Sequence, residues 1–273
     1  MSNLVGSQPN AYDNLRNELP HVAPYLFNLA DKVLGAAPEA NWDVMLCDDV
    51  SGRLPAYFIR RVLAESGQPI STRFIAGSKA YHERFDPQVY RDYYLHLTAG
   101  LSSQVLNVLI VTEATHSGAT LNYLKNVLTP VTHSIETAAA VNVVPRKLAT
   151  DYTGGEGLKA GRLVRHAFET IRPGKTLDRF ADRIHEYMPE ILEYVPEFVR
   201  QHTPTVIKRT GLTHTHDLLS LGVSDEARYP QVSRTAHNAH TAFAYQTMEA
   251  LVQSYCASET FLLMSRAKQY SMT

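Results

Sequence analysis

Apolar and polar residues follow each other along the first 150 residues in blocks that predict strands and helices in turn. The strongest block, 105–111, is a run of aliphatic and β-branched residues with polar neighbours, a pattern typical of a parallel strand buried on both faces. Other blocks carry apolar residues at helical spacing, such as Ala56, Ile59, Val62 and Leu63. The pattern predicts strands at 42–48, 70–76, 105–111 and 138–144, and helices at 54–66 and 121–128.

The two ends of the chain have helical spacing. Tyr25, Leu26, Leu29, Val33 and Leu34 predict a helix that ends near Gly35. Helical spacing returns at 158–201 and at 237–268. The sequence therefore predicts an α/β fold, an open and mostly parallel sheet with a largely helical C-terminal half. The expected segments are an N-terminal helical segment (1–41), an α/β core (42–150) and a mainly helical region (151–273).

Composition narrows the class of protein. The chain has 273 residues, of which 44% are hydrophobic and 19% charged, and a net charge of −1. That balance disfavours a protein that holds nucleic acid by bulk electrostatics. Two distant cysteines, Cys47 and Cys256, form neither a zinc pattern nor a disulfide framework, which favours the reducing cytoplasm. No apolar run approaches the ~20 residues that span a bilayer, so no membrane partner is expected, and the start of the chain lacks the features of a signal peptide.

Polar residues directly after the strand 105–111 are the clearest candidate for chemistry. Glu113 is expected just past that strand, where its carboxylate can accept hydrogen bonds from sugar hydroxyls. Ser117, Gly118 and Thr120 open the next helix, where backbone N–H groups and two hydroxyls form an anion site. These residues suggest a phosphorylated sugar as ligand. The alternative is an ordinary helix N-terminus, because Ser and Thr cap helices in any α/β protein.

Residues 108–120 resemble the phosphoribosyl-pyrophosphate-binding motif of type I phosphoribosyltransferases. That motif is four aliphatic residues, two acids, three variable residues and then Thr-Gly-x-Thr. The chain matches the aliphatic run, the second acid (Glu113), Ser117 in place of Thr, Gly118 and Thr120, and it departs from the motif at Thr112, where the first acid would stand. The resemblance assigns ribose and phosphate binding to the segment Thr112, Glu113, Ala114, Thr115, His116, Ser117, Gly118, Ala119 and Thr120.

The same resemblance implies a pyrophosphate-binding loop after the first core strand. Residues 48–53 have the right order and spacing for that loop. The resemblance therefore implies that Ser51, Gly52 and Arg53 contact the pyrophosphate. Mg²⁺ is the implied cofactor, with Asp48 and Asp49 as its candidate ligands. Lys79 and Arg84 lie where family members carry a mobile loop that shields the reaction, so Lys79 is a further candidate for pyrophosphate contact. An ordinary surface loop with solvated charges remains the alternative there.

The implied reaction transfers 5-phosphoribosyl from phosphoribosyl pyrophosphate to an unidentified acceptor and releases pyrophosphate. Glu113, His116 and Arg53 are the candidate catalytic residues, with His116 in a motif position that faces the incoming base in purine-type enzymes. Family members are often dimers, so a homodimer is an expectation that rests on the resemblance alone.

Two other interpretations stay open. Thr112 in place of an acid is also typical of a drifted, non-catalytic relative that binds a nucleotide or phosphoribosyl pyrophosphate as a sensor. An unrelated doubly wound α/β protein is the third, because fold does not fix function. The pairs His214/His216 and His237/His240 have the spacing of metal ligands, but 12 histidines make close pairs common by chance.

Overall fold

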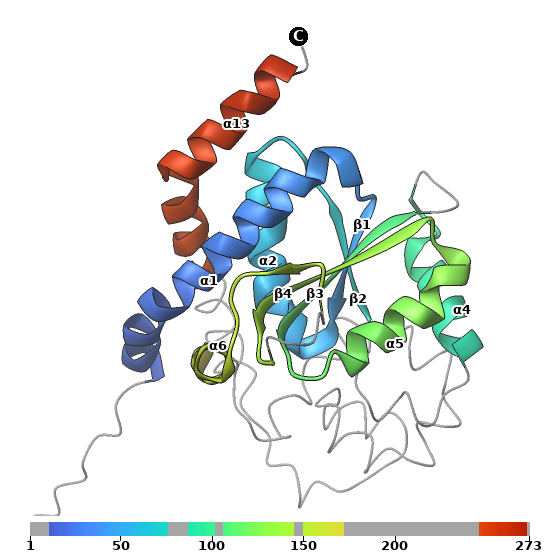
Figure 1. Cartoon of the computed structure of the whole chain (residues 1–273), viewed down its shortest axis with the longest axis horizontal. Helices are drawn as coiled ribbons and strands as arrows, with labels where there is room; N and C mark the ends of the chain where they lie inside the picture. The colour runs from blue at the N-terminus through green and yellow to red at the C-terminus, as the bar shows by residue number, and fades with distance from the viewer. Residues whose placement is uncertain (1–10, 76–86, 102–105, 145–149, 172–245, 272–273) are drawn as a thin grey trace, which may run out of the picture.

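The computed structural model describes residues 11–75, 87–101, 106–144, 150–171 and 246–271. Within these residues the chain forms one open sheet of five parallel strands in the order β2-β1-β3-β4-β5 (Figure 1). The strands are β1 Val44–Asp48, β2 Ser71–Ile75, β3 Asn107–Thr115, β4 Ser134–Asn142 and β5 Tyr152–Thr153. The predicted α/β fold with an open parallel sheet is therefore confirmed.

The order of the strands places the switch point of the sheet, called the crevice below, between β1 and β3. From β1 the chain moves outward to β2, and it then returns past β1 to place β3 on the other side. The connections that follow β1 and β3 run to opposite faces of the sheet, because α2 packs on one face and α5 on the other. In open α/β sheets this switch point is where ligands bind.

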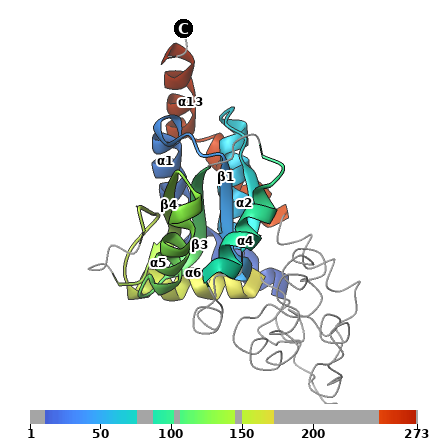
Figure 2. The same ribbon diagram turned by 90° about the vertical axis from the view of Figure 1, so that its right-hand side faces the viewer.

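Helices cover both faces of the sheet (Figures 1 and 2). Met45, Cys47, Leu109 and Val111 share one core with α1 (Ala11–Ala40), α2 (Asp49–Glu65), α6 (Leu158–Ile171) and the C-terminal helices. The alternate residues of the same strands share a second core with α4 (Pro87–Thr98) and α5 (Ala119–Leu128). Because side chains alternate along a strand, two apolar layers explain the uninterrupted hydrophobic runs of β1 and β3.

Helix α1 is longer than its sequence predicts. It continues through Gly35 to Ala40, and Asn41 ends it in the left-handed conformation (φ 43°), with its N–H bonded to the carbonyl oxygen of Ala37. The predicted stop at Gly35 is wrong because a glycine inside a helix is tolerated at a modest cost. α1 also covers the edge of the sheet: Lys32 and Asn28 donate hydrogen bonds to the carbonyl oxygens of Thr153 and Gly154.

Three boundaries at the crevice differ from the predicted ones. α2 begins at Asp49 rather than Leu54, so the expected loop 51–53 is the first turn of a helix. β3 runs to Thr115 rather than 111, and Glu113 consequently lies inside the strand. β4 begins at Ser134 and ends at Asn142, whereas the sequence predicts 138–144. The predicted end of β3 is too early because polar residues such as Thr112 and Glu113 usually mark a strand boundary in a sequence pattern.

Gly52 allows the first turn of α2 to lie directly on β3 at Val111, next to the end of β1. A Cβ atom at residue 52 would stand 2.4 Å from the carbonyl oxygen of Val111 and 3.3 Å from Cα of Cys47. Both atoms belong to the backbone of the sheet and cannot rotate away. Glycine is therefore required here for close packing, whatever ligand the turn contacts.

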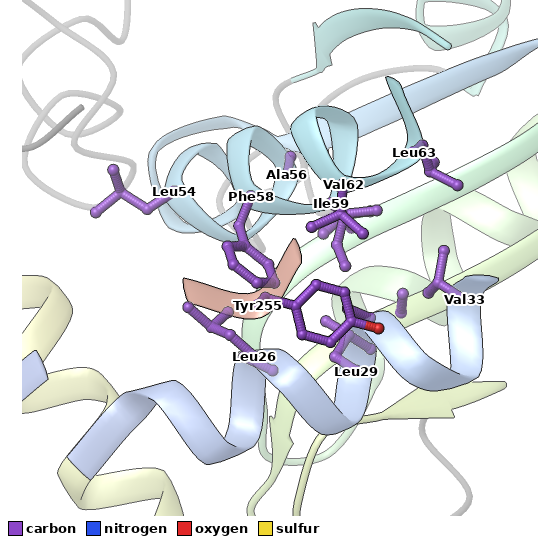
Figure 3. Close-up of a cluster of buried hydrophobic side chains, with 14 of the residues drawn as sticks. Leu26, Leu29, Val33, Leu54, Ala56, Phe58, Ile59, Val62, Leu63 and Tyr255 are labelled. Carbon is purple, nitrogen blue, oxygen red and sulfur yellow. The ribbon is translucent and has the colours of Figure 1, made fainter. Parts of the chain in front are cut away.

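The C-terminal helices join the same core from the far end of the sequence. Residues 246–256 are helical, and α13 (Glu259–Ser271) follows after a short break. Figure 3 shows the ring of Tyr255 between Leu26 and Leu29 of α1 and Phe58 of α2. Its hydroxyl donates a hydrogen bond to Asp31 (2.7 Å). Beyond this contact α13 extends away from the sheet (Figures 1 and 2).

An ion pair fastens the helix 246–256 to α2. Arg61 donates two hydrogen bonds to the carboxylate of Glu249 (2.8 and 3.0 Å), and the hydroxyl of Tyr57 donates a third (3.1 Å). The Arg61 hydrogen bond is the main reason that the pKa of Glu249 lies below its usual value of 4.5. Most of the predicted helical region 158–201 and its neighbours up to 245 lies outside the described residues.

Replacing Gly52 by alanine tests the close approach of α2 to β3. We expect Gly52→Ala to lower the free energy of unfolding by about 2 kcal/mol, because the new methyl overlaps backbone that cannot move. Gly35→Ala is the matched control inside α1, where the nearest atom is 3.7 Å from the added Cβ. It should raise the free energy of unfolding by up to ~1 kcal/mol. Urea denaturation measures both, and equal effects would contradict the packing described.

The Arg61–Glu249 pair should make stability depend on pH. A carboxyl whose pKa is lowered in the folded state stabilises that state fully above its unfolded pKa, and the contribution is lost as the pH falls through the lowered value. Glu249→Gln should cost about 1 kcal/mol at pH 7, and the difference from wild type should shrink below pH 4.5. Thermal unfolding across pH measures this, with the exposed Glu39→Gln as control. A difference that stays constant down to pH 2 would refute it.

Candidate functional site

The segment after β3 lines a hollow of about 190 Å³ at the carboxyl end of the sheet. Thr112, Ala114 and Thr115 contribute from the strand, and the loop and first turn of α5 supply the remainder. Eight of the nine residues assigned to ribose and phosphate binding therefore lie around one space; they are Thr112, Ala114, Thr115, His116, Ser117, Gly118, Ala119 and Thr120. Among the residues that the structure describes, none of the side chains that line the hollow is acidic, which suits an anion.

Gly118 sets the shape of the loop. It is the N-cap of α5 with φ 71° and ψ 3°, a left-handed conformation that residues with a Cβ adopt at a cost. The hydroxyl oxygen of Ser117 accepts a long hydrogen bond from the N–H of Ala119 (3.4 Å). The first N–H groups of a helix have no partner within that helix and carry the positive end of its dipole. The arrangement can therefore hold a phosphate at α5.

His116 and Ser117 are exposed at the rim, while Thr112 is buried, with 3% of its surface accessible. The exposed imidazole of His116 is accessible to a ligand in the hollow, as the predicted role near an acceptor requires. Thr112 presents a hydroxyl and a methyl where a carboxylate is expected in the family motif, so the wall of the hollow is neutral at this position.

Glu113 lies on the other side of β3 from the hollow. Alternation along the strand places it on the face of Leu109 and Val111, which α1, α2 and α6 cover, and only 4% of its surface is accessible. The prediction that it sits past the strand is wrong. Because Leu109 and Val111 pack in the core that α2 shares, Glu113 is directed to the α2 side of the crevice, whereas Thr112 and Ala114 are directed to the α5 side.

The pyrophosphate candidates 51–53 lie on the first turn of α2, across β3 from the hollow. Arg53 is buried with 6% of its surface accessible, and Gly52 contacts β3 as described above. Asp48 ends β1 and Asp49 begins α2, so their backbones lie at the crevice. Lys79 lies outside the described residues, as do Arg84 and the histidine pairs.

Asn142 is a buried polar residue at this edge that the sequence does not flag. It ends β4 opposite Thr115, and the Thr115 hydroxyl donates a hydrogen bond to its Oδ1 (2.5 Å). The sequence predicts that this strand ends at 144, two residues too late. Asn142 therefore looked like an interior strand residue and not like the last one. The one available signal was a polar residue between buried apolar ones.

Metal and membrane features are absent from the part of the chain that the structure describes. No group of three or more His, Cys, Asp and Glu side chains gathers among these residues. No helix in the same ranges has the length and apolar character needed to cross a membrane. Cys256 is half-buried, and burial raises the pKa of its thiol to about 11, which makes it a poor nucleophile.

The chain matches no family model and no curated protein. A solved structure of hypoxanthine-guanine phosphoribosyltransferase from Schistosoma mansoni in complex with IMP is similar to part of it, with 17% sequence identity and a TM-score of 0.32. The similarity covers 50% of this chain and 63% of that one, so the chain spans less than two thirds of the enzyme's length. At this level we infer no function from it.

Proposed function

We propose that the protein is a phosphoribosyltransferase-like protein that binds phosphoribosyl pyrophosphate at the carboxyl ends of β1 and β3 and transfers its phosphoribosyl group to an acceptor. The observation that carries the proposal is the hollow formed by Thr112 and residues 114–121 at the switch point of the sheet. The described residues that line it include no acid, and the left-handed Gly118 and the helix N-terminus suit the 5-phosphate.

In this proposal the two phosphorylated ends of the ligand bind on opposite sides of β3. The 5-phosphate occupies the α5 side, and the diphosphate faces the first turn of α2, where Arg53 lies. Glu113, on the α2 side, is then the carboxylate nearest the sugar hydroxyls. Breaking the bond from the anomeric carbon to the diphosphate leaves the electron pair on pyrophosphate, whose growing charge basic side chains stabilise.

Mg²⁺ is proposed as the cofactor because it characteristically binds through one or two carboxylates together with substrate phosphates. Asp48 and Asp49 are the residues that would hold it, since their backbones lie at the crevice beside the proposed diphosphate. The ion would neutralise the leaving diphosphate. His116, exposed at the rim, is proposed to accept a proton from the acceptor.

A second candidate is a sensor that binds the same ligand without catalysis. Thr112 favours it, because this buried residue lines the hollow with a neutral side chain where the resemblance expects an acid. Release of pyrophosphate separates the two candidates: the enzyme releases it in the presence of a suitable base, and the sensor does not.

Calorimetric titration with phosphoribosyl pyrophosphate, with and without Mg²⁺, tests the proposed site. We expect binding that strengthens with Mg²⁺ and that falls about tenfold in Gly118→Ala, because a Cβ at φ 71° shifts the loop that holds the phosphate. Gly67→Ala is the matched control, since Gly67 also has a positive φ (80°), and its Cβ would contact nothing within 4 Å.

Both glycine variants should lose about 1 kcal/mol of stability, so only the difference in ligand affinity reports on the site. Glu113→Gln, which keeps the shape of the buried side chain, should weaken binding of phosphoribosyl pyrophosphate. Absence of binding by the wild type at millimolar ligand would leave the segment 116–120 as an ordinary helix start and would end the proposal.

A further inference from the structure

Two buried polar side chains connect the ends of β3 and β4 next to the hollow. Thr115 and Asn142 are opposite each other in the parallel register and have 5% and 3% of their surface accessible. The Thr115 hydroxyl donates to Oδ1 of Asn142. Thr115 itself lines the hollow, whereas Asn142 does not. Asn142 is therefore connected to the lining of the hollow only indirectly, by its hydrogen bond with Thr115.

Backbone hydrogen bonds surround this pair. The N–H of Val143 donates to the carbonyl oxygen of Thr115 (2.8 Å). The N–H of Asn142 donates to Gly155, and its carbonyl oxygen accepts from Gly157, both at 2.8 Å. Residue 142 is thus held on both sides, by β3 and by the segment 154–157. Its side chain is a fixed point against which the end of β3 can be oriented.

The segment 154–157 is itself held by α1. A Cβ at Gly154 would stand 1.9 Å from the carbonyl oxygen of Tyr25, and one at Gly155 would stand 2.4 Å from Cδ1 of the Tyr25 ring. Asn28 adds a hydrogen bond to the carbonyl oxygen of Gly154 (3.3 Å). Packing this close leaves the segment no room to slide, so Asn142 is supported from the far edge of the sheet.

A hydrogen bond between two buried side chains contributes only about 1 kcal/mol to stability, and two apolar residues of the same shape can replace it with little effect. What distinguishes it from an apolar contact is that it fixes the orientation of both side chains. Thr115 is the last residue of β3, and the loop 116–118 begins directly after it. The orientation of Thr115 therefore sets where that loop starts.

We infer that Asn142 is a positioning residue for the phosphate-binding loop: through the Thr115 hydroxyl it holds the end of β3 in the orientation that the ligand requires. The inference rests on the proposed function of the hollow. It assigns to Asn142 a role in affinity that exceeds its contribution to stability.

A hydrogen bond in the first half of β4 provides the control. The hydroxyl of Thr137 donates to Oδ2 of Asp151 (2.8 Å), and Thr137 is buried to the same degree as Thr115, with 4% accessible. It lies five residues before Asn142, or about 16 Å along the strand. Thr137→Val removes a buried threonine hydroxyl that bonds to Asp151, beside β5, without touching the hollow.

The experiment measures the affinity of the full chain for ribose 5-phosphate, which probes the α5 side without diphosphate or Mg²⁺. Thr115→Val should weaken binding about tenfold, the equivalent of one lost hydrogen bond of ~1.4 kcal/mol. Thr115→Ser keeps the hydroxyl and should bind within about twofold of wild type. Thr137→Val should bind as wild type does, although it also lowers the melting temperature.

The outcomes separate the inference from the function on which it rests. Equal affinity of Thr115→Val and wild type, or equal loss in Thr137→Val, overturns the positioning role and leaves the proposed site intact. Failure of wild type to bind either ribose 5-phosphate or phosphoribosyl pyrophosphate overturns both. If Thr115→Val does not fold, Asn142→Ala makes the same comparison by removing the acceptor, with the same expected loss.

Discussion

The close contact between the first turn of α2 and β3 is the constraint on which the candidate site depends. Because Gly52 has no Cβ, the turn lies against the carbonyl oxygen of Val111, and α2 starts at the crevice rather than beside it. α2, which carries Arg53, covers the face of β3 on which Glu113 lies, and α5 covers the other face. The two sides of a single strand thereby acquire different chemistry.

The surrounding layers hold this arrangement from a distance. α1 covers one face of the sheet and its β5 edge, and Tyr255 of the helix 246–256 packs between α1 and α2 (Figure 3). The Arg61–Glu249 ion pair fixes the other half of α2. Segments from both ends of the sequence therefore share a single hydrophobic core with the sheet that carries the site. Stability and the geometry of the crevice are coupled through α2.

Much of the fold could be predicted from the sequence because parallel strands buried on both faces leave strong apolar runs, as β1 and β3 do. The ends of these strands were harder to predict than their existence. Thr112, Glu113 and Thr115 are polar yet belong to β3, and tertiary packing rather than local pattern keeps them there. β5 was missed because two residues leave no pattern. The segment 116–120 could be predicted from its spacing. The face to which Glu113 points could not, because predicting it requires the true end of β3.

The central claim is that a phosphorylated sugar binds across the end of β3, with its phosphate at α5 and its diphosphate at α2. Amide chemical-shift mapping by NMR tests this most directly. Ribose 5-phosphate should shift the amides of 116–121 alone, and phosphoribosyl pyrophosphate with Mg²⁺ should add those of 51–53. Shifts confined to other elements, or none with either ligand, would contradict the account.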